Sequence, residues 1–185
     1  MLMTSGAESD LQTPMGFVND AAVLPWYAVK VRVGGEPQVN AVLENKGYEV
    51  FCPTYLETRK YSDRLKSVNV ALFSGYTFCR LEISKRLPVL VTEGVNGIVS
   101  FGGVPQPIPE EEIEKIRSAI KSGARAKPWP YLTAGRRIRI QCGSMAGLEG
   151  ILVKIKGSDH VVLSITMLQR SVCVEIDRSW IQPVL

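Results

Sequence analysis

The hydrophobic positions of this chain follow different periods in its two halves. Residues 26–101 combine strand-like runs with a helix-like stretch, whereas residues 138–176 alternate between apolar and polar side chains. A period of two is typical of half-buried β-strands, and spacings of three and four residues are typical of an amphipathic helix. We therefore expect an α+β part followed by an all-β part.

The first half begins with a strand–helix–strand pattern. We expect a strand at 26–33, a helix that begins near Pro37 and is capped by Gly47, and a second strand at 48–52. A last strand is expected at 95–101. The apolar stripe of the helix consists of Val39, Val42 and Leu43.

Three further segments complete the first half. Residues 57–70 are polar and basic and lack an apolar face, so we expect an extended hairpin with a Ser-Asp turn at 62–63. Residues 72–81 form an apolar strand that Gly75 interrupts. A helix is expected after Pro109, because acidic residues suit the first turn of a helix. Its apolar stripe consists of Ile113, Ile116 and Ile120.

The second half predicts a small barrel. Its four or five short strands favour a closed barrel, because closure removes exposed strand edges. The segment before it combines glycine, basic residues and two prolines without any periodicity, which is typical of a linker of polyproline II character. We therefore expect a disordered tail at 1–22, an N-terminal domain at 23–122, a linker at 123–133 and a barrel domain at 134–185.

The charge pattern changes this picture only slightly. The net charge is +4, and nine basic but only four acidic residues follow residue 122. Such a surplus favours a polyanionic partner or an acidic protein surface, although it also occurs on surfaces without a partner. No apolar run reaches the roughly 20 residues of a membrane-spanning helix, and no signal-peptide pattern is present. We therefore expect a cytoplasmic protein without a membrane partner.

The residue types offer little catalytic chemistry. The four cysteines are far apart and form no CxxC pair, and the chain has one histidine, His160. A zinc site is not expected, and the cysteines should be reduced, buried hydrophobes. No convergent nucleophile, base and orienting group can be identified, and no nucleotide-binding glycine fingerprint is present. The sequence predicts no catalytic residue, no metal and no cofactor.

Several segments carry a family resemblance. Three of them resemble, in order, the signature segments of the N-terminal domain of the NusG family, and two are similar to the KOW motif of that family. The segments are Trp26–Val29, Ala71–Tyr76, Glu93–Val99, Gly135–Ile140 and Ala146–Gly150. The resemblance spans residues 24–185 and depends on the order and spacing of the motifs, because each motif alone is common.

The resemblance implies a fold and a function. The fold is an antiparallel sheet flanked by helices, followed by a small SH3-like KOW barrel. The function is that of a monomeric transcription elongation or antitermination factor that binds RNA polymerase and is not an enzyme. The alternative is a ribosome-associated or RNA-binding KOW protein, because such barrels also occur in ribosomal proteins.

The resemblance also implies a polymerase-binding surface. In the family, a hydrophobic depression receives the clamp helices of the largest polymerase subunit, and aromatic anchors often dominate such interfaces. The matching residues are Phe73, Gly75, Tyr76, Phe78 and Ile98. Alternation should place Phe73 and Tyr76 on opposite faces, with Tyr76 open to the partner, and Ser74 should loosen a turn where the family usually has proline. The alternative is that these apolar side chains belong to the core.

Residues 59–66 and 169–172 look more like specialised antiterminator paralogues, including the UpxY-type regulators of polysaccharide operons. There the hairpin region reads the non-template DNA strand. The matching DNA-binding residues are Arg32, Lys60, Tyr61, Arg64 and Lys66. The alternative is a solvated charged hairpin.

The resemblance further implies a partner for the barrel. In the family, the KOW barrel recruits Rho or a small-subunit ribosomal protein. The matching residues are Met145, Leu168 and Arg170. The alternative is that they belong to the barrel core or to a surface without a partner.

Overall fold

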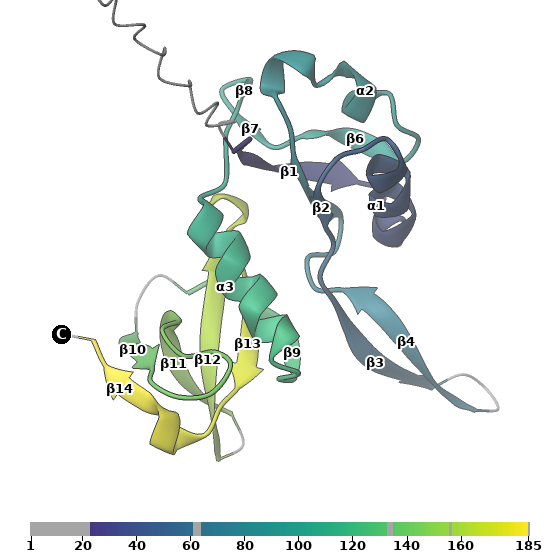
Figure 1. Cartoon of the computed structure of the whole chain (residues 1–185). Helices are drawn as coiled ribbons and strands as arrows, with labels where there is room; N and C mark the ends of the chain where they lie inside the picture. Colours follow the sequence, from purple (N-terminus) through teal and green to yellow (C-terminus); the bar gives the residue numbers. More distant parts are fainter. Residues whose placement is uncertain (1–22, 61–63, 133–134, 156, 185) are drawn as a thin grey trace, which may run out of the picture.

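The computed structural model describes residues 23–184 except 61–63, 133–134 and 156. The tail predicted at 1–22 lies outside the described residues. A four-stranded sheet has the order β2-β5-β1-β6, and a six-stranded sheet has the order β14-β10-β11-β12-β13-β9. Helix α3 lies between the two sheets (Figure 1).

The first sheet and its helices follow the predicted order. Its antiparallel strands are β1 (Trp26–Val31), β2 (Val50–Phe51), β5 (Tyr76–Arg80) and β6 (Val95–Ile98). The helices on it are α1 (Glu36–Asn45), the 3-10 turn η1 (Ile83–Lys85) and α2 (Leu87–Leu90). Two hairpins leave it, a long one of β3 (Thr54–Lys60) and β4 (Leu65–Ala71) and a short one of β7 (Ser100–Phe101) and β8 (Val104–Pro105).

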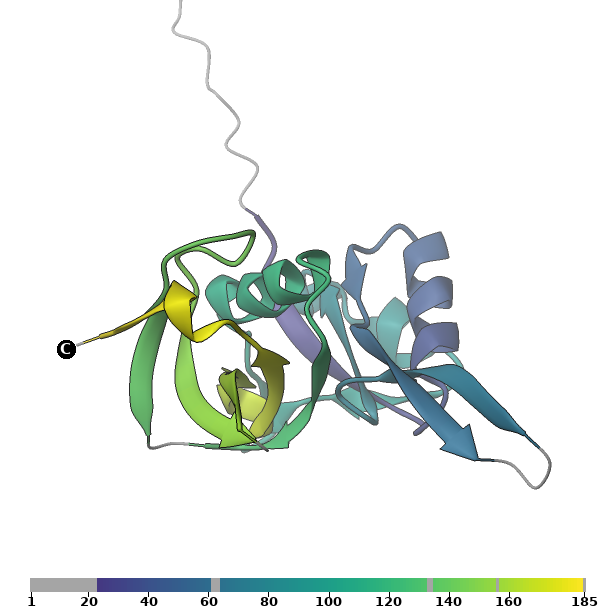
Figure 2. The ribbon, with the colours of Figure 1, turned by 90° about the horizontal axis from the view of Figure 1, so that it is seen from below.

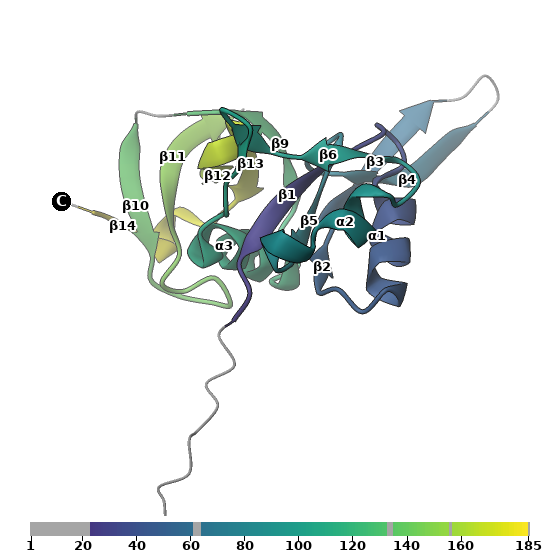
Figure 3. The same cartoon turned by 90° about the horizontal axis from the view of Figure 1, so that it is seen from above.

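Helices α1 and α2 cover one face of the first sheet, and α3 and the barrel lie on the other side (Figure 3). On the first face Val29 packs with Val39 and Leu43 of α1, which are buried as predicted. Val42 was expected in the same stripe but is 43% exposed. The inward face of α1 instead begins at Glu36, so Val42 lies at its rim.

The second half contains one helix and six strands. They are α3 (Glu110–Lys121), β9 (Ala126–Pro130), β10 (Arg136–Ile140), β11 (Glu149–Ile155), β12 (Ser158–Ile165), β13 (Arg170–Glu175) and β14 (Ile181–Pro183), with 3-10 turns η2 (Thr166–Leu168) and η3 (Arg178–Trp180). The linker predicted at 123–133 was wrong for 126–130, because this segment pairs with β13 as an edge strand. Prolines are tolerated on an edge, where no N–H is needed on the outer side.

The barrel is completed by a helix and not by strand pairing. β9 and β14 are opposite edges of the six-stranded sheet, so the predicted closure by strands was wrong. Helix α3 lies across the open side of this curled sheet (Figure 2). Its Ile113, Ile116 and Ala119 are fully buried, in one cluster with Val161 and Leu163 of β12.

This apolar cluster extends beyond the barrel. Trp26, Ala28 and Phe78 of the first sheet belong to it together with the buried residues of α3. The two halves of the chain therefore share one core, in which α3 is the common element. We call this set of residues the shared core.

The close approach of β11 to β12 generates a stability prediction. A Cβ at Gly150 would lie 2.4 Å from Val161 Cγ1 and 2.7 Å from the Val162 carbonyl oxygen. Because a backbone carbonyl cannot rotate away, Gly150→Ala should lower the free energy of unfolding in urea by about 1–3 kcal/mol.

The matched control is Gly157→Ala. Gly157 has a φ of 88° and no atom within 4 Å of an added Cβ, so only the left-handed backbone is penalised, by about 1 kcal/mol. A loss at Gly150 that is smaller than the loss at Gly157 would contradict the close packing described here.

Candidate polymerase and nucleic-acid interfaces

The turn at Phe73–Tyr76 positions the aromatic side chains that the family resemblance identifies. Gly75 has a φ of 82°, a left-handed conformation that favours glycine. Its N–H donates to the buried Glu36 carboxylate at 2.7 Å, and its carbonyl accepts from the Val31 N–H at 2.9 Å. Helix α1 and strand β1 therefore fix this turn, although Ser74 replaces the proline of the family.

Phe73 and Tyr76 lie on the same side of the sheet as Phe78, so the predicted opposite faces were wrong. The reason is that β5 begins only at Tyr76, and the turn before it breaks the alternation. Phe73 packs edge-to-face on Phe78 with ring centroids 5.3 Å apart, and the Phe51 centroid is 6.1 Å from that of Phe78. We call Phe51, Phe73, Tyr76 and Phe78 the aromatic cluster.

The aromatic cluster is covered in this arrangement. Phe73 is 1% exposed, Phe78 is 0% exposed, and Tyr76 is half-buried. The open depression that we expected at these residues is therefore filled by other parts of the chain. Ile98 does not join the cluster, because its pairing with Val29 places it on the opposite face, with α1 and α2.

Charged side chains attach α3 to the same face of the first sheet. The Arg117 guanidinium carbon lies 5.3 Å from the Trp26 ring centroid and 5.2 Å from that of Phe51. Arg80 lies 4.7 Å from the Trp26 centroid, and the Trp26 indole N–H donates to Glu110 at 3.3 Å. Each cation–π contact contributes about 0.5–2 kcal/mol, depending on its exposure. Charged side chains therefore cover the Trp26 ring.

Two polar contacts join the barrel to α3 and to the first sheet. The backbone N–H and hydroxyl of Thr166 donate to the Glu112 carboxylate of α3 at 3.1 and 2.6 Å. The Arg170 guanidinium carbon lies 5.8 Å from the Tyr76 ring centroid. We call the Glu112–Thr166 contact the clasp. Sequence reasoning missed it, because its partners are 54 residues apart and belong to no local pattern.

The residues predicted to bind a partner of the barrel do not form one free surface. Met145 is 4% exposed and belongs to the shared core, so its predicted place on the surface was wrong. Leu168 is half-buried against the same core. Arg170 is exposed but lies over Tyr76. In this arrangement the predicted surface is directed largely into the molecule.

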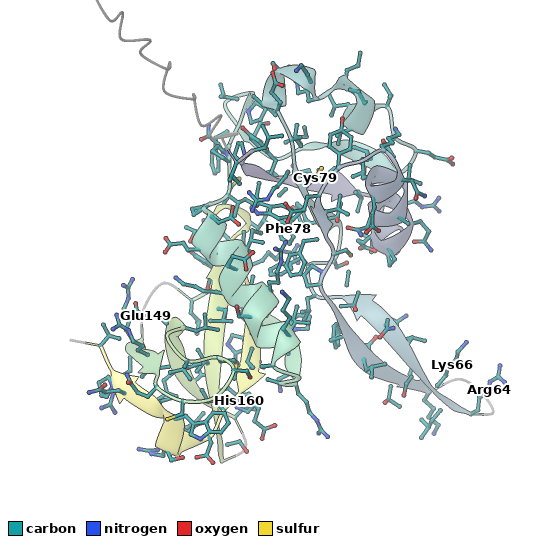
Figure 4. All side chains as sticks on the ribbon, in the orientation of Figure 1. Arg64, Lys66, Phe78, Cys79, Glu149 and His160 are labelled. Atoms are coloured by element: carbon teal, nitrogen blue, oxygen red, sulfur yellow. The ribbon has the colours of Figure 1, made fainter. Side chains whose placement is uncertain are left out.

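The long hairpin carries the predicted nucleic-acid-binding cations. Arg64 and Lys66 lie at its far end, distant from Phe78 (Figure 4). Lys60 pairs with Leu65 across the hairpin, so three exposed basic residues lie at one end. Exposed cations at the end of a hairpin can contact a phosphate backbone. The aromatic cluster is largely buried and carries no such charge.

Two other predicted nucleic-acid contacts are not part of this group. Tyr61 lies outside the described residues. Arg32 is exposed directly after β1, where its backbone N–H donates to the Gly94 carbonyl at 2.9 Å. Arg59, on the hairpin, forms an ion pair with Glu57 at 2.6 Å, which reduces its availability for phosphate.

The described residues offer no obvious nucleophile. Burial, together with the nearby Glu36 carboxylate, raises the pKa of Cys52 to about 11, and burial raises the pKa of Cys79 to about 12. Both thiols therefore remain protonated and unreactive. All four cysteines were expected to be buried, but Cys142 is exposed and Cys52 is only partly buried. Within the described ranges, no three His, Cys, Asp or Glu side chains gather to hold a metal ion.

The helices of the described part are too short or too polar to cross a membrane.

Comparison with known proteins identifies the same family as the sequence motifs. A family model described as "Transcription termination factor nusG" matches residues 24–117. The transcription termination/antitermination protein NusG of Lactococcus lactis is 26% identical over 173 residues, which cover 86% of this chain and 92% of the relative. The corresponding Campylobacter jejuni protein is 24% identical, over 86% and 97%.

A solved structure shares the fold. The structure described as "Domain interaction in Thermotoga maritima NusG" has a TM-score of 0.52 and 23% identity, and covers 87% of this chain and 97% of its own. The family match alone includes 94 of the 185 residues and contains α1, α2, the long hairpin and most of α3. The chain therefore belongs to the NusG family of transcription termination and antitermination factors.

Proposed function

We propose that this chain binds RNA polymerase through the aromatic cluster and modulates elongation or termination. The observation that carries the proposal is that Phe73, Tyr76 and Phe78 gather on one sheet face, held by a turn that Glu36 fixes. Packed aromatic groups of this kind supply the anchors of protein interfaces. The proposed occupant is the pair of clamp helices of the largest polymerase subunit, and the proposed location is the cytoplasm.

Binding of polymerase requires that the barrel leave this face. Thr166 of the barrel forms the clasp with Glu112, and Arg170 of the barrel covers Tyr76. Phe73 is inaccessible in this arrangement. The proposed hinge is Gly123, whose φ of 74° ends α3. The structure then represents a closed form, and the proposed domains are 23–122 and 134–185, with β9 moving with the barrel.

The proposed roles of the other predicted residues follow from the same separation. Leu168, which is half-buried against the shared core, and Arg170, which lies over Tyr76, become fully available to a partner of the barrel, such as Rho or a small-subunit ribosomal protein, in the open form. Lys60, Arg64 and Lys66 are exposed in the closed form, and we assign them to the non-template DNA strand. Specialisation of the UpxY type stays a prediction.

A second candidate function is RNA binding by the barrel. Arg137 and Arg139 of β10 are exposed and lie on the same outer face of the strand, where Arg139 also forms an ion pair with Glu149. Structured RNA would then bind with a steep dependence on salt. Co-purification with core polymerase favours the first function, and retention of structured RNA without polymerase favours the second.

Replacement of Tyr76 tests the polymerase surface. Removal of an interface anchor costs about 2 kcal/mol, so Tyr76→Ala should raise the Kd for core polymerase about 30-fold. The simultaneous loss of the contact with Arg170 favours opening by only about 0.5–1 kcal/mol, so weakened binding should dominate. Tyr48→Ala is the matched control, since Tyr48 packs against α1 and not the aromatic cluster. Unchanged binding of the Tyr76 variant, with a collapsed melting temperature, would show that Tyr76 is only a core residue.

Removal of the clasp tests the closed form. Glu112→Ala deletes both acceptors of Thr166, and at this exposed position we expect the closed form to lose about 1 kcal/mol, so that the ratio of closed to open molecules falls about fivefold. Small-angle X-ray scattering should report a larger radius of gyration. Glu111→Ala is the control, because Glu111 lies in the same first turn and forms an ion pair with Lys115 of the same helix, at 3.9 Å. Equal radii for the two variants would argue against the clasp.

Replacement of the hairpin cations tests the nucleic-acid role. If Arg64 and Lys66 each contact one phosphate, the double alanine variant should bind single-stranded DNA with a log–log salt slope that is smaller by about 1.4. The control is Lys85→Ala/Arg86→Ala, which removes the same charge from the exposed turn before α2. The proposal fails if the hairpin variant retains the parent slope or if both variants change it equally.

A further inference from the structure

A groove of about 930 Å³ separates the long hairpin from the barrel. One wall consists of residues 54–58 of β3, and the opposite wall consists of residues 123–127, which lead into β9. Residues 54–58 include side chains from both faces of β3, and Ala126 and Lys127 are the first two residues of β9. The edges of β3 and β9 therefore border the groove, and their free backbone groups are available for recognition in addition to its side chains.

The edge of β3 presents unpaired backbone groups. β3 pairs only with β4 in the described sheets. The Leu72 N–H donates to the Pro53 carbonyl at 2.8 Å, and in an antiparallel pair such bonded positions recur at every second residue. The N–H and C=O groups of Leu56 and Thr58 fall between them, so they point to the free edge and into the groove.

The edge of β9 faces the groove from the other side. β9 is an edge strand that pairs only with β13 among the described strands. Pro128 has no N–H, so the residues that bond to β13 are its neighbours Lys127 and Trp129. Ala126 therefore turns its N–H and C=O toward the groove. The prolines block the rest of this edge, which confines strand addition to the groove.

The side chains of the groove favour an uncharged occupant. Thr58, Ser67 and Asn69 line the hairpin wall with Leu56, which is 71% exposed. The charged lining residues are two basic and two acidic, so they attract no polyanion as a group; they are Glu57, Arg125, Lys127 and Glu175. An extended residue fills roughly 160 Å³, from a rise of about 3.3 Å, a strand spacing of about 4.8 Å and a sheet spacing of about 10 Å. The groove therefore holds about six residues.

We propose that this groove binds one extended, uncharged peptide segment of a partner protein, which adds a strand between β3 and β9. Backbone hydrogen bonds on both sides give affinity, and small or β-branched side chains fit the neutral walls. Both halves of the chain form the groove, so the bound segment stabilises the closed form. The site differs from the aromatic cluster and requires neither polymerase nor DNA.

The test uses a fluorescein-labelled peptide, Gly-Thr-Val-Thr-Val-Thr-Gly, and the full chain. Fluorescence anisotropy should give a Kd below roughly 1 mM. The same peptide with alternate backbone amides methylated keeps its side chains but loses donors, and should bind at least tenfold more weakly. Amide hydrogen exchange should show new protection at Leu56, Thr58 and Ala126.

Variants assign the site. Thr58→Pro removes a groove-facing N–H but none that bonds to β4, and should weaken binding about tenfold, as should Ala126→Pro on the other wall. Lys60→Pro makes the same change nearer the hairpin tip, outside the groove lining, and should bind as the parent does. Circular dichroism melts establish that each variant is folded.

The proposal is overturned if the peptide does not bind, if the methylated peptide binds equally well, or if protection appears at other amides. It is also overturned if Lys60→Pro weakens binding as much as both groove variants do. Binding of a labelled oligothymidine in this groove in place of the peptide would also overturn the proposal, because it would identify a nucleic-acid site.

Discussion

The arrangement depends on the burial of the apolar side of α3 between the first sheet and the barrel. Burial of one isoleucine side chain stabilises by about 1.5–3 kcal/mol, so Ile113 and Ile116 contribute more than the clasp, which is worth about 1 kcal/mol. Apolar packing therefore contributes most to holding the two halves together, and the polar contacts of Glu112 and Arg170 add to it. If the barrel leaves, this surface needs another cover.

This constraint connects structure and proposed function. The shared core contains Phe73 and Phe78 of the polymerase-binding proposal as well as Val161 and Leu163 of the barrel. One surface cannot be covered by the barrel and by a polymerase helix at the same time. Closure and polymerase binding are therefore expected to compete, and any ligand that bridges the two halves should favour closure.

Much of the fold could be predicted from the sequence because its signals are local. Pro37, Gly47 and the apolar spacing defined α1, and the acidic first turn with its isoleucine stripe defined α3. Strict alternation predicted the barrel strands. The errors arose where tertiary contacts override local pattern: residues 126–130 pair with β13 in spite of two prolines, and α3 closes the barrel in place of a strand.

The candidate site divides in the same way. The exposure of the hairpin cations was predictable because a charged, core-free segment is visible in the sequence, and their role stays a prediction. The order of family motifs pointed to Phe73, Tyr76 and Phe78 of the aromatic cluster but not to Phe51. The covering of that cluster was not predictable, because it requires the relative position of two domains. The face of Phe73 was wrong because a turn fixed by Glu36, distant in the sequence, interrupts the strand.

The measurement that tests this account most directly is polymerase binding by a chain that cannot open. Cysteines introduced at Glu112 and Thr166, with Cys142→Ser, would be joined by a short bis-maleimide, and the same variant capped with a monofunctional maleimide would serve as the reference. The account predicts that the capped protein binds core polymerase and the cross-linked protein does not. Equal binding by the two would contradict it.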